Sequence, residues 1–359
     1  MAFIELYKKK LQHNYQHLEQ LFDRYHIEWS IVTKLLCGHE DYLKEVINLG
    51  IRQVCDSRIS NLEMVKTLQP EIETIYIKPP SQSTLPDIVK FADISFNTEF
   101  ETIKGLSEEA QRQNKKHKII IMVELGDLRE GIMGENLIDF YESIFKLPNI
   151  DVIGLGANLN CLYGIMPSED KLIQLNLYKQ LIEAKFNRSL PIISGGTSVV
   201  IPLLERKQVP KGINHFRVGE MLYFGNDLFT GDTVPGMHDD VFRLKAQIIE
   251  ITEKPKVPSG VMEATPSGVQ YEIDEEDYGK TMRRAIVDIG LLDVAQEDFL
   301  IPEDERITIC GASSDMLVLD LEETDQKYQV GEFISFRMKY MGALRAFNSE
   351  YVEKKIIDA

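Results

Sequence analysis

The feature that most constrains the fold is a regular alternation of short β-branched runs with longer amphipathic segments over the first two thirds of the chain. Strict alternation implies parallel strands joined by right-handed crossovers. Eight such strands in succession predict a closed (β/α)₈ barrel, with an open doubly wound sheet as the alternative. The expected strands span residues 29–33, 53–56, 74–77, 93–96, 119–124, 151–155, 190–193 and 215–218, with helices expected at 39–49, 57–67, 98–114 and 168–186.

The pattern changes after about Asp227, where Gly231-Asp-Thr-Val-Pro-Gly236 is typical of a linker or turn. Strand-like runs then follow one another without intervening helices, which predicts a second, mainly antiparallel β domain. We therefore expect a barrel over residues 1–228 and a β domain over residues 229–359. The expected strands of the second domain are 242–251, 281–289, 306–309, 316–321 and 333–338.

The charge balance restricts the partners that the chain can bind. A formal net charge of −17 disfavours nucleic acid and anionic membrane, because both require a basic footprint. An acidic chain can attract cationic small molecules, although acidity also serves solubility alone. The four cysteines form no CxxC pair and no metal-ligand spacing, the apolar runs are too short to span a bilayer, and the N-terminus lacks the order of a signal peptide. We expect a cytoplasmic protein without a metal.

Two glycine-bearing loops follow the seventh and eighth expected strands, where (β/α)₈ barrels commonly bind phosphate. The first is Ser194-Gly-Gly-Thr-Ser198, and the second is Arg217-Val-Gly-Glu220. Glycines allow backbone N–H groups to approach a phosphate closely, and Thr197 and Ser198 add hydroxyl donors. One such loop alone is better explained as a structural turn, whereas two at both expected positions favour phosphate.

The first expected strand ends in Ile31-Val-Thr-Lys34, which places an amine at the barrel mouth. A desolvated lysine can lose its proton and form a Schiff base with an aldehyde. The alternative is a lysine that extends along the rim into solvent. Opposite a phosphate site the Schiff base is favoured, and an aldehyde cofactor that carries a phosphate is pyridoxal 5'-phosphate.

These segments together resemble the fold-type III pyridoxal-phosphate enzymes of the alanine racemase superfamily, and within it the ornithine racemase branch. Each segment is weak in isolation, but their order along the chain is specific. The resemblance extends nearly end to end and rests on Thr33-Lys-Leu-Leu-Cys-Gly38, Cys55-Asp-Ser-Arg-Ile-Ser-Asn61, Val123-Glu-Leu-Gly-Asp-Leu-Arg-Glu-Gly131, Gly154-Leu-Gly-Ala-Asn-Leu-Asn160, Ser194–Ser198, Arg217–Glu220 and Gly311-Ala-Ser-Ser-Asp315.

The resemblance implies a role for each matching residue. Lys34 would carry the cofactor and move the α-proton on one face, and Arg129 would bind near the phenolic oxygen. Arg217 would lie against the pyridine nitrogen. Ser198 and the backbone of the two glycine loops would hold the phosphate. The expected cofactor site is Lys34, Arg129, Asn158, Ser194, Gly195, Gly196, Thr197, Ser198, Arg217, Gly219 and Glu220.

Arg217 discriminates between two reactions of this superfamily. A guanidinium stays protonated, so it can only donate to the ring nitrogen, which then stays unprotonated. The related decarboxylases have a glutamate there, so an arginine favours racemisation. If no cofactor binds, the alternative is an arginine that pairs with a core carboxylate such as Glu124.

The chain departs from alanine racemase at several positions. Gly38 stands in place of a tyrosine that reaches the phosphate, Met122 in place of a modified lysine, and Asn158 in place of a histidine beneath the ring. Leu291 stands at the tyrosine that serves as the second base, and leucine cannot transfer a proton. Two-base racemisation requires a group on each face of the α-carbon.

We hypothesise that the turn at residues 310–315 supplies the second base, from Ser313, Ser314 or Asp315. In the family this turn enters the partner subunit's active site, which implies a homodimer. An ordinary polar turn is the alternative. An aspartate there also favours a cationic side chain, so the expected substrate is a basic amino acid, ornithine first. An alanine racemase, an amino acid decarboxylase and a non-catalytic pyridoxal-phosphate binding protein are the other candidates.

Overall fold

The computed structural model describes residues 1–264, 270 and 272–358, and the chain divides into two compact units. The first unit is Lys8–Val241 with Asp358, and the second is Met1–Tyr7 with Phe242–Ile357. This division differs from the expected 1–228 and 229–359, because the first seven residues belong with the second unit.

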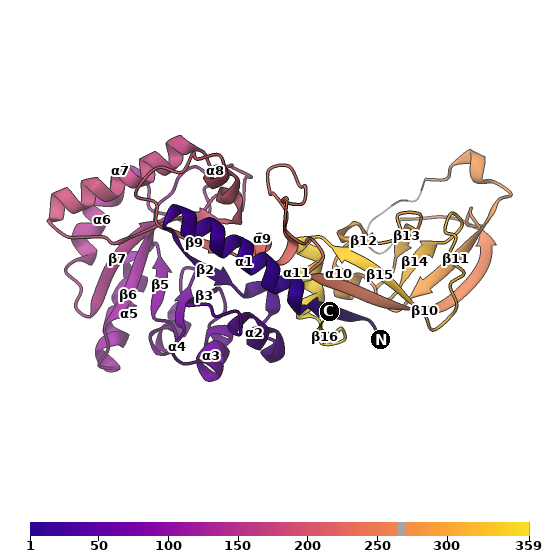
Figure 1. The fold of residues 1–359 in the computed structure, drawn as a ribbon, viewed down its shortest axis with the longest axis horizontal. Helices are drawn as coiled ribbons and strands as arrows, with labels where there is room; N and C mark the ends of the chain where they lie inside the picture. Colours follow the sequence, from indigo (N-terminus) through magenta and orange to yellow (C-terminus); the bar gives the residue numbers. More distant parts are fainter. Residues whose placement is uncertain (265–269, 271, 359) are drawn as a thin grey trace. The chain divides into compact units, whose positions relative to one another are not determined.

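The first unit is a closed barrel of eight parallel strands, which confirms the fold class expected from the alternation (Figure 1). The first and last strands pair with each other, with Ser30 opposite Arg217, and so close the barrel. The strands in order are β2 (Glu28–Val32), β3 (Gln53–Asp56), β4 (Glu73–Tyr76), β5 (Ile94–Asn97), β6 (His117–Met122), β7 (Ile150–Gly156), β8 (Ile192–Thr197) and β9 (His215–Val218).

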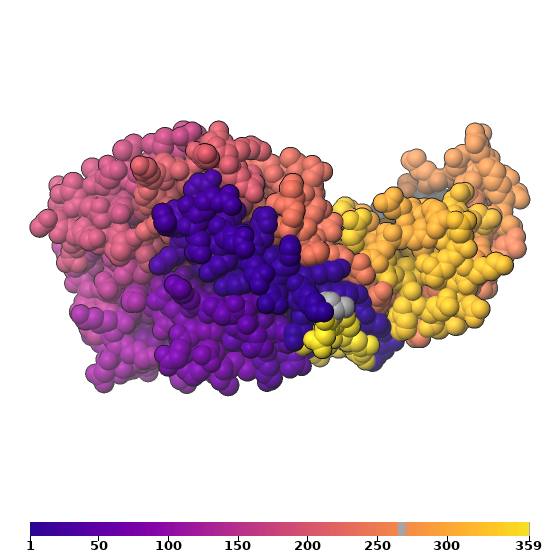
Figure 2. All heavy atoms as spheres, in the orientation of Figure 1, coloured from indigo at the N-terminus to yellow at the C-terminus, as the bar shows by residue number. Residues whose placement is uncertain are grey.

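Helices cover the outside of this barrel. In α5, Ile103, Leu106 and Ala110 are buried at helical spacing, and the Glu99 side chain caps the first turn by accepting from the Thr102 N–H. Figure 2 shows the side chains of α1 as an indigo band on one face of the unit. The helices are α1 (Lys8–Tyr25), α2 (Glu40–Ile47), α3 (Ile59–Leu68), α4 (Leu85–Phe91), α5 (Phe100–Arg112), α6 (Leu137–Ile144), α7 (Glu169–Phe186), α8 (Ile201–Glu205) and α9 (Glu220–Phe224).

Single 3₁₀ turns stand between several strands and helices of the barrel. They are η1 (Lys34–Leu36), η2 (Gln82–Thr84), η3 (Gly134–Asn136) and η4 (Ser198–Val200). Two of them, η1 and η4, begin at residues that the sequence assigns to the cofactor site. The interior of the barrel contains a cluster of buried residues formed by Cys55, Ile75, Ile94, Phe96, Ile120 and Met122.

The second unit is built on a sheet with the order β12-β15-β10-β11-β14-β13, and each of these neighbours is antiparallel, as expected. In β1, Ile4 and Leu6 are buried, and the strand pairs with β10 and, in parallel, with β16. The strands are β1 (Phe3–Tyr7), β10 (Phe242–Pro255), β11 (Thr281–Val287), β12 (Leu300–Pro302), β13 (Thr308–Ala312), β14 (Leu317–Asp320), β15 (Phe333–Met338) and β16 (Glu353–Ile357), and the helical segments are η5 (Glu275–Asp277), α10 (Leu291–Val294), η6 (Glu297–Phe299) and α11 (Tyr340–Asn348).

Membrane-spanning helices and metal-binding clusters are both absent from the described residues. No helix there is both long and apolar enough to cross a membrane. The same residues contain no cluster of three or more His, Cys, Asp or Glu side chains that could hold a metal ion.

Candidate functional site

The residues assigned to the cofactor in the sequence gather at the carboxyl end of the barrel, because parallel strands all end on the same side. Lys34 lies just after β2, Arg129 after β6 and Asn158 after β7. The run from Ser194 to Thr197 forms the end of β8, and Arg217 lies on β9, shortly before α9. The barrel therefore brings together side chains from five strand ends.

The backbone before Lys34 is fixed by contacts with the end of β3. The Thr33 N–H donates to the Cys55 carbonyl at 2.9 Å, and the Thr33 hydroxyl donates to Asp56 at 2.9 Å. Asp56 is buried, and burial raises the pKa of its carboxyl although hydrogen bonds from Arg58 and Asn61 oppose that shift. This anchoring defines the position from which the half-buried Lys34 side chain extends.

Glu220, the first residue of α9, lies within electrostatic range of Lys34. Burial raises the pKa of Glu220, while a hydrogen bond with Asn226 and the positive charge of Lys34 act in the opposite direction. Helix α9 is tied to the end of β2, because the Tyr223 hydroxyl donates to the Val32 carbonyl at 3.2 Å. The lysine and the glutamate are thus held together by contacts between their two elements.

The end of β8, with the loop that continues from it, is shaped so that only glycine fits at two positions. A Cβ on Gly195 would lie 2.5 Å from the Ile213 side chain. Gly196 has a φ of +148°, and a Cβ there would lie 2.4 Å from the Val200 side chain. The backbone amides of this loop are therefore unobstructed by side chains of their own, as a phosphate site requires.

Ser198 connects the two glycine loops. Its hydroxyl oxygen accepts N–H bonds from Gly219 at 3.3 Å and from Met221 at 3.2 Å. Because the oxygen is occupied as an acceptor, its own hydrogen points elsewhere and can be donated to an anion. The Ser198 hydroxyl thus lies next to the backbone N–H groups of the second glycine loop.

Arg217 is buried in the barrel with 2% of its surface exposed. One Nη1 N–H donates to the Ser194 hydroxyl at 2.5 Å, and Nη2 donates to the Ala157 carbonyl at 2.9 Å. The guanidinium lies over the Phe96 ring at 4.9 Å. Burial lowers the pKa of Arg217 to about 10, which leaves the group protonated at neutral pH.

Arg217 forms no ion pair within the described part of the chain, so the alternative of a core carboxylate partner fails. Glu124, the proposed partner, instead accepts N–H bonds from Gly126 and Leu128. The known contacts of Arg217 leave Nε–H and the second Nη2 hydrogen for another acceptor. A buried cation with donors to spare is suited to an acceptor such as a ring nitrogen.

Arg129 and Asn158 lie on two loops that are joined by Asp127. The Asp127 carboxylate accepts backbone N–H bonds from four residues of the loop after β7, namely Cys161, Leu162, Tyr163 and Ile165. Burial alone would raise the pKa of Asp127, but these hydrogen bonds outweigh it and hold the pKa below its usual value. Asp127 is a residue that the sequence gave no reason to select.

The side chains of these two loops have partners of their own. Arg129 is exposed and forms an ion pair with its neighbour Glu130. The Asn158 amide donates to the Cys161 sulfur at 3.0 Å. The structure thus places both residues at the mouth, with the Arg129 guanidinium engaged by a carboxylate.

His215 is a second residue that the sequence analysis missed. Its ring is 2% exposed and lies 2.8 Å from the Ser194 hydroxyl, directly behind Arg217. A signal was present, because residues 215 and 217 are two apart on a strand and therefore face the same side. A polar residue two positions before an interior arginine indicates a contact behind it.

Comparison with known proteins bears on this arrangement. A family model described as "Alanine racemase, N-terminal domain" matches residues 7–227, which include all eight barrel strands. The chain belongs to the alanine racemase family. It is 38% identical to the ornithine racemase of Acetoanaerobium sticklandii over 97% of both chains, and 31% identical to the lysine racemase of Thermotoga maritima over 96% of both chains.

Solved structures of alanine racemases share the fold. The enzyme from Streptomyces coelicolor matches with a TM-score of 0.77 and 13% identity over 100% of this chain and 98% of its own. The enzyme from Bartonella henselae, solved with covalently bound pyridoxal phosphate, matches with a TM-score of 0.74 and 16% identity over 99% of each chain. At this identity the similarity concerns the fold.

The second unit contains Leu291, the residue at which the resemblance places the missing second base. The Leu291 N–H donates to the Ser313 carbonyl at 2.9 Å, and the Leu292 N–H donates to the Ser314 carbonyl at 3.0 Å. Ser313, Ser314 and Asp315 are exposed in the turn between β13 and β14. The structure thus joins the leucine to the turn that the sequence selected as an alternative source of a base.

Proposed function

We propose that this chain is a pyridoxal-phosphate-dependent racemase that interconverts the L- and D-enantiomers of a basic amino acid, ornithine first. The observation that carries the proposal is the buried guanidinium of Arg217, which has no carboxylate partner within the described residues and has N–H groups left to donate. The names of the two relatives, ornithine racemase and lysine racemase, support a basic substrate. The acidic charge of the chain is compatible with it.

The residues at the mouth fit the cofactor. Gly195 and Gly196 form a cradle that a Cβ would fill, and Ser198 has a hydroxyl hydrogen to donate to the phosphate. Lys34 would hold the cofactor through its amine, and Arg217 would donate to the ring nitrogen. Thr197, Gly219 and Glu220 complete the proposed phosphate side, and Arg129 and Asn158 the side of the phenolic oxygen and the ring.

The bound cofactor supplies an electron sink for the negative charge that develops at the substrate Cα. Lys34 would remove the α-proton of one enantiomer and, in the reverse direction, deliver a proton to the same face, while the opposite face is served by another group. Arg217 keeps the ring nitrogen unprotonated, because a guanidinium can only donate, and thereby favours proton transfer over loss of carbon dioxide. The glycine loops and Ser198 hold the phosphate in place during both proton transfers.

We propose that Ser314 and Asp315 serve the opposite face, since Leu291 cannot transfer a proton. They would act in the active site of a partner subunit, so the proposal includes a homodimer, and it also includes a cytoplasmic location. Asp315 would in addition pair with the distal amine of the substrate. A double variant, Ser314→Ala with Asp315→Ala, is expected to lose racemisation by about 10²-fold or more; full activity would remove this assignment.

The decisive experiment is deuterium incorporation at Cα in D₂O, measured for a panel of L- and D-amino acids with the purified holoenzyme. We expect rapid exchange and racemisation of ornithine, slower turnover of lysine and little of alanine. Reduction with borohydride should fix the cofactor to Lys34, as mass spectrometry of the tryptic peptide would show. Carbon dioxide release from L-ornithine, or absence of a borohydride-reactive chromophore, would contradict the proposal.

A further inference from the structure

A hydrogen-bonded chain leads away from Arg217 into the barrel. The Ser194 hydroxyl that accepts from Arg217 lies 2.8 Å from Nδ1 of His215. On the other side of the ring, Nε2 of His215 lies 2.7 Å from the Ser30 hydroxyl. Ser30, Ser194, His215 and Arg217 are each at most 2% exposed.

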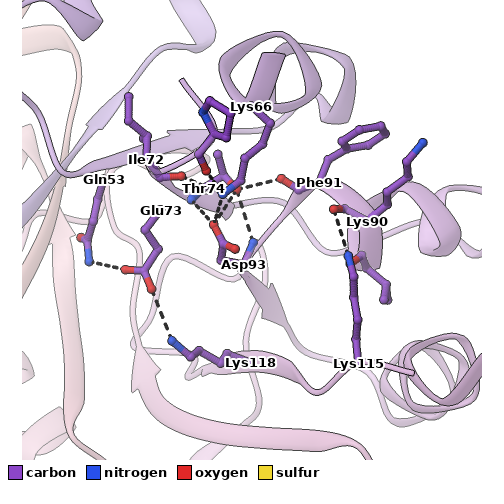
Figure 3. A network of polar contacts seen from close by, with 12 residues as sticks. Gln53, Lys66, Ile72, Glu73, Thr74, Lys90, Phe91, Asp93, Lys115 and Lys118 are labelled. Carbon is purple, nitrogen blue, oxygen red and sulfur yellow. Dashed lines mark hydrogen bonds and ion pairs between the residues drawn. The ribbon is translucent and has the colours of Figure 1, made fainter. Parts of the chain in front are cut away.

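The chain continues to the amino-terminal end of the barrel. The Ser30 hydroxyl donates to Oε1 of Gln53 at 2.9 Å, and Nε2 of Gln53 donates to the Glu73 carboxylate at 2.7 Å. Figure 3 shows this last link, with Lys118 on the other oxygen of Glu73 at 3.4 Å. We call the series Arg217, Ser194, His215, Ser30, Gln53 and Glu73 the interior chain.

The ends of the interior chain fix the direction of every bond within it. The guanidinium of Arg217 can only donate, and the carboxylate of Glu73 can only accept. Because the Gln53 amide donates to Glu73, its Oε1 faces Ser30 and accepts the Ser30 hydrogen. With its hydrogen given to Gln53, Ser30 can only accept from His215, which therefore carries a hydrogen on Nε2. In the neutral ring Nδ1 is then bare and accepts from the Ser194 hydroxyl.

This arrangement requires a neutral imidazole. Burial and the nearby charge of Arg217 lower the pKa of His215 to about 3. A protonated ring would have a hydrogen on Nδ1, directed at a Ser194 oxygen that already accepts from Arg217 at 2.5 Å, and the Ser194 hydrogen would lose its acceptor. The neutral ring is thus the form in which the Ser194 hydrogen has an acceptor within the interior chain.

We propose that Ser194 and His215 are positioning residues for Arg217, and that the interior chain sets the orientation in which the guanidinium meets the cofactor's ring nitrogen. The inference rests on the proposed function for its cofactor, but the orientation of His215 is a property of the protein alone. A planar guanidinium without a carboxylate partner can rotate about its side-chain bonds. The Ser194 hydroxyl and the Ala157 carbonyl accept from Nη1 and Nη2 of the guanidinium. Because His215 accepts the Ser194 hydrogen, a lone pair of the Ser194 oxygen is directed at Arg217.

The first test needs no cofactor. In the apoprotein, ¹⁵N–¹H correlation spectra of the histidine rings should show His215 with hydrogen on Nε2 and a bare Nδ1 at neutral pH. In Ser194→Ala, which removes the donor to Nδ1, the Nδ1 resonance should move to the position of an unbonded nitrogen. A hydrogen on Nδ1 of His215 in the wild type would overturn the inference.

The second test uses the holoenzyme and a matched control. His117 is also 2% exposed and lies 2.8 Å from a serine hydroxyl, that of Ser95, but it is outside the interior chain. In Ser194→Ala and His215→Gln, we expect an altered absorption spectrum of the cofactor and a dissociation constant for pyridoxal phosphate about tenfold higher, as for loss of one hydrogen bond to a charged group. His117→Gln should keep both wild-type values, and Ser194→Thr, which retains the hydroxyl, should restore them.

The outcomes separate the two proposals. If wild-type protein binds no pyridoxal phosphate, the proposed function fails, while the ring spectra still decide the orientation of His215. If the wild type binds the cofactor on Lys34 but Ser194→Ala and His215→Gln behave as His117→Gln does, the interior chain only stabilises the barrel and the positioning role is wrong. Circular dichroism of each apoprotein identifies a variant that fails to fold, and Ser194→Thr then decides by its spectrum.

Discussion

The two ends of the barrel unit differ in whether certain polar side chains already have all their hydrogen-bond partners. At the amino-terminal end, charged groups satisfy one another: Lys66 donates to the Pro70 and Ile72 carbonyls at 3.2 and 2.8 Å and to Asp93 at 2.6 Å (Figure 3). At the carboxyl end, Arg217 and Ser198 retain hydrogens to donate. Side chains whose hydrogen bonds are all formed within the protein stabilise the fold, whereas side chains with hydrogens left to donate can bind a ligand.

A cavity of about 420 Å³ does not coincide with the proposed cofactor site. It lies near the amino-terminal end, where Tyr15, Trp29 and Glu73 are among its lining residues. No residue of the proposed cofactor site lines it. The ends differ in backbone conformation and in unsatisfied donors, and variants at the two ends should therefore separate activity from stability.

The largest expected effect is at the mouth. Lys34→Ala removes the amine that we propose binds the cofactor and moves the proton, and we expect racemisation to fall by at least about 10³-fold. The half-buried side chain is not part of the core, so the unfolding midpoint in urea should remain near that of the wild type. Racemase assays by chiral chromatography would test this, and a variant that retains a tenth of the activity would contradict it.

The two buried histidines predict an acid-sensitive fold. Burial lowers the pKa of His117 to about 4 and that of His215 to about 3, both below the usual 6.5. Between those values and 6.5 the unfolded chain binds more protons, so stability is present above about pH 6.5 and is lost as the pH falls.

From pH 6.5 to 5, each histidine should cost about 1.5 kcal/mol of unfolding free energy, or about 3 kcal/mol together. Urea unfolding at several pH values measures this slope. His117→Gln, at the amino-terminal end, should reduce this pH dependence of the unfolding free energy by about half. Between pH 7 and 8 the unfolding free energies of the variant and the wild type should change with pH in the same way. An unchanged slope in this variant would contradict the prediction.

Gly196, in the proposed phosphate loop (residues 194–198), offers a smaller but more specific effect. In Gly196→Ala, the new Cβ would lie 2.4 Å from Val200 at a φ of +148°, so the loop must move. We expect a loss of about 1–3 kcal/mol in stability and about tenfold weaker binding of pyridoxal phosphate, measured by fluorescence titration.

Gly50→Ala is the matched control at the other end of the barrel, because Gly50 has a φ of +86° but no atom within 4 Å of the new Cβ. Gly50→Ala should lower the free energy of unfolding only because alanine is strained at a positive φ, and it should leave the affinity for the cofactor unchanged. Equal losses of affinity in both variants would show that the effect is not specific to the phosphate loop.

The smallest effect on activity is expected at the amino-terminal end of the barrel. Lys66→Met removes an ion pair and two hydrogen bonds to carbonyls, and should lower the free energy of unfolding by about 1–2 kcal/mol with kcat/KM within twofold of wild type. Lys116→Met, at an exposed lysine nearby, should change neither quantity. A loss of activity in Lys66→Met beyond its loss of folded protein would indicate that the two ends are coupled.

The sequence by itself determined the barrel and the positions of its main site residues. Alternation of strand and helix patterns is a local property, so the eight strands and the placement of Lys34 and Arg217 at their carboxyl ends follow from it. Gly195 and Gly196 were likewise recognisable, because they are adjacent in the sequence and glycine is expected where backbone N–H groups must be approached closely. Period-two alternation also indicates which side of a strand faces inward.

Only the tertiary structure decided which inward side chains meet. His215 and Ser30 are 185 residues apart, and His215 and Gln53 are 162 apart, so no local pattern marks these contacts. The same applies to β1, whose five residues pair with strands from the far end of the chain. Closure of the barrel brings distant strands side by side, and hydrogen bonds across it depend on register and distance, which a single sequence does not encode locally.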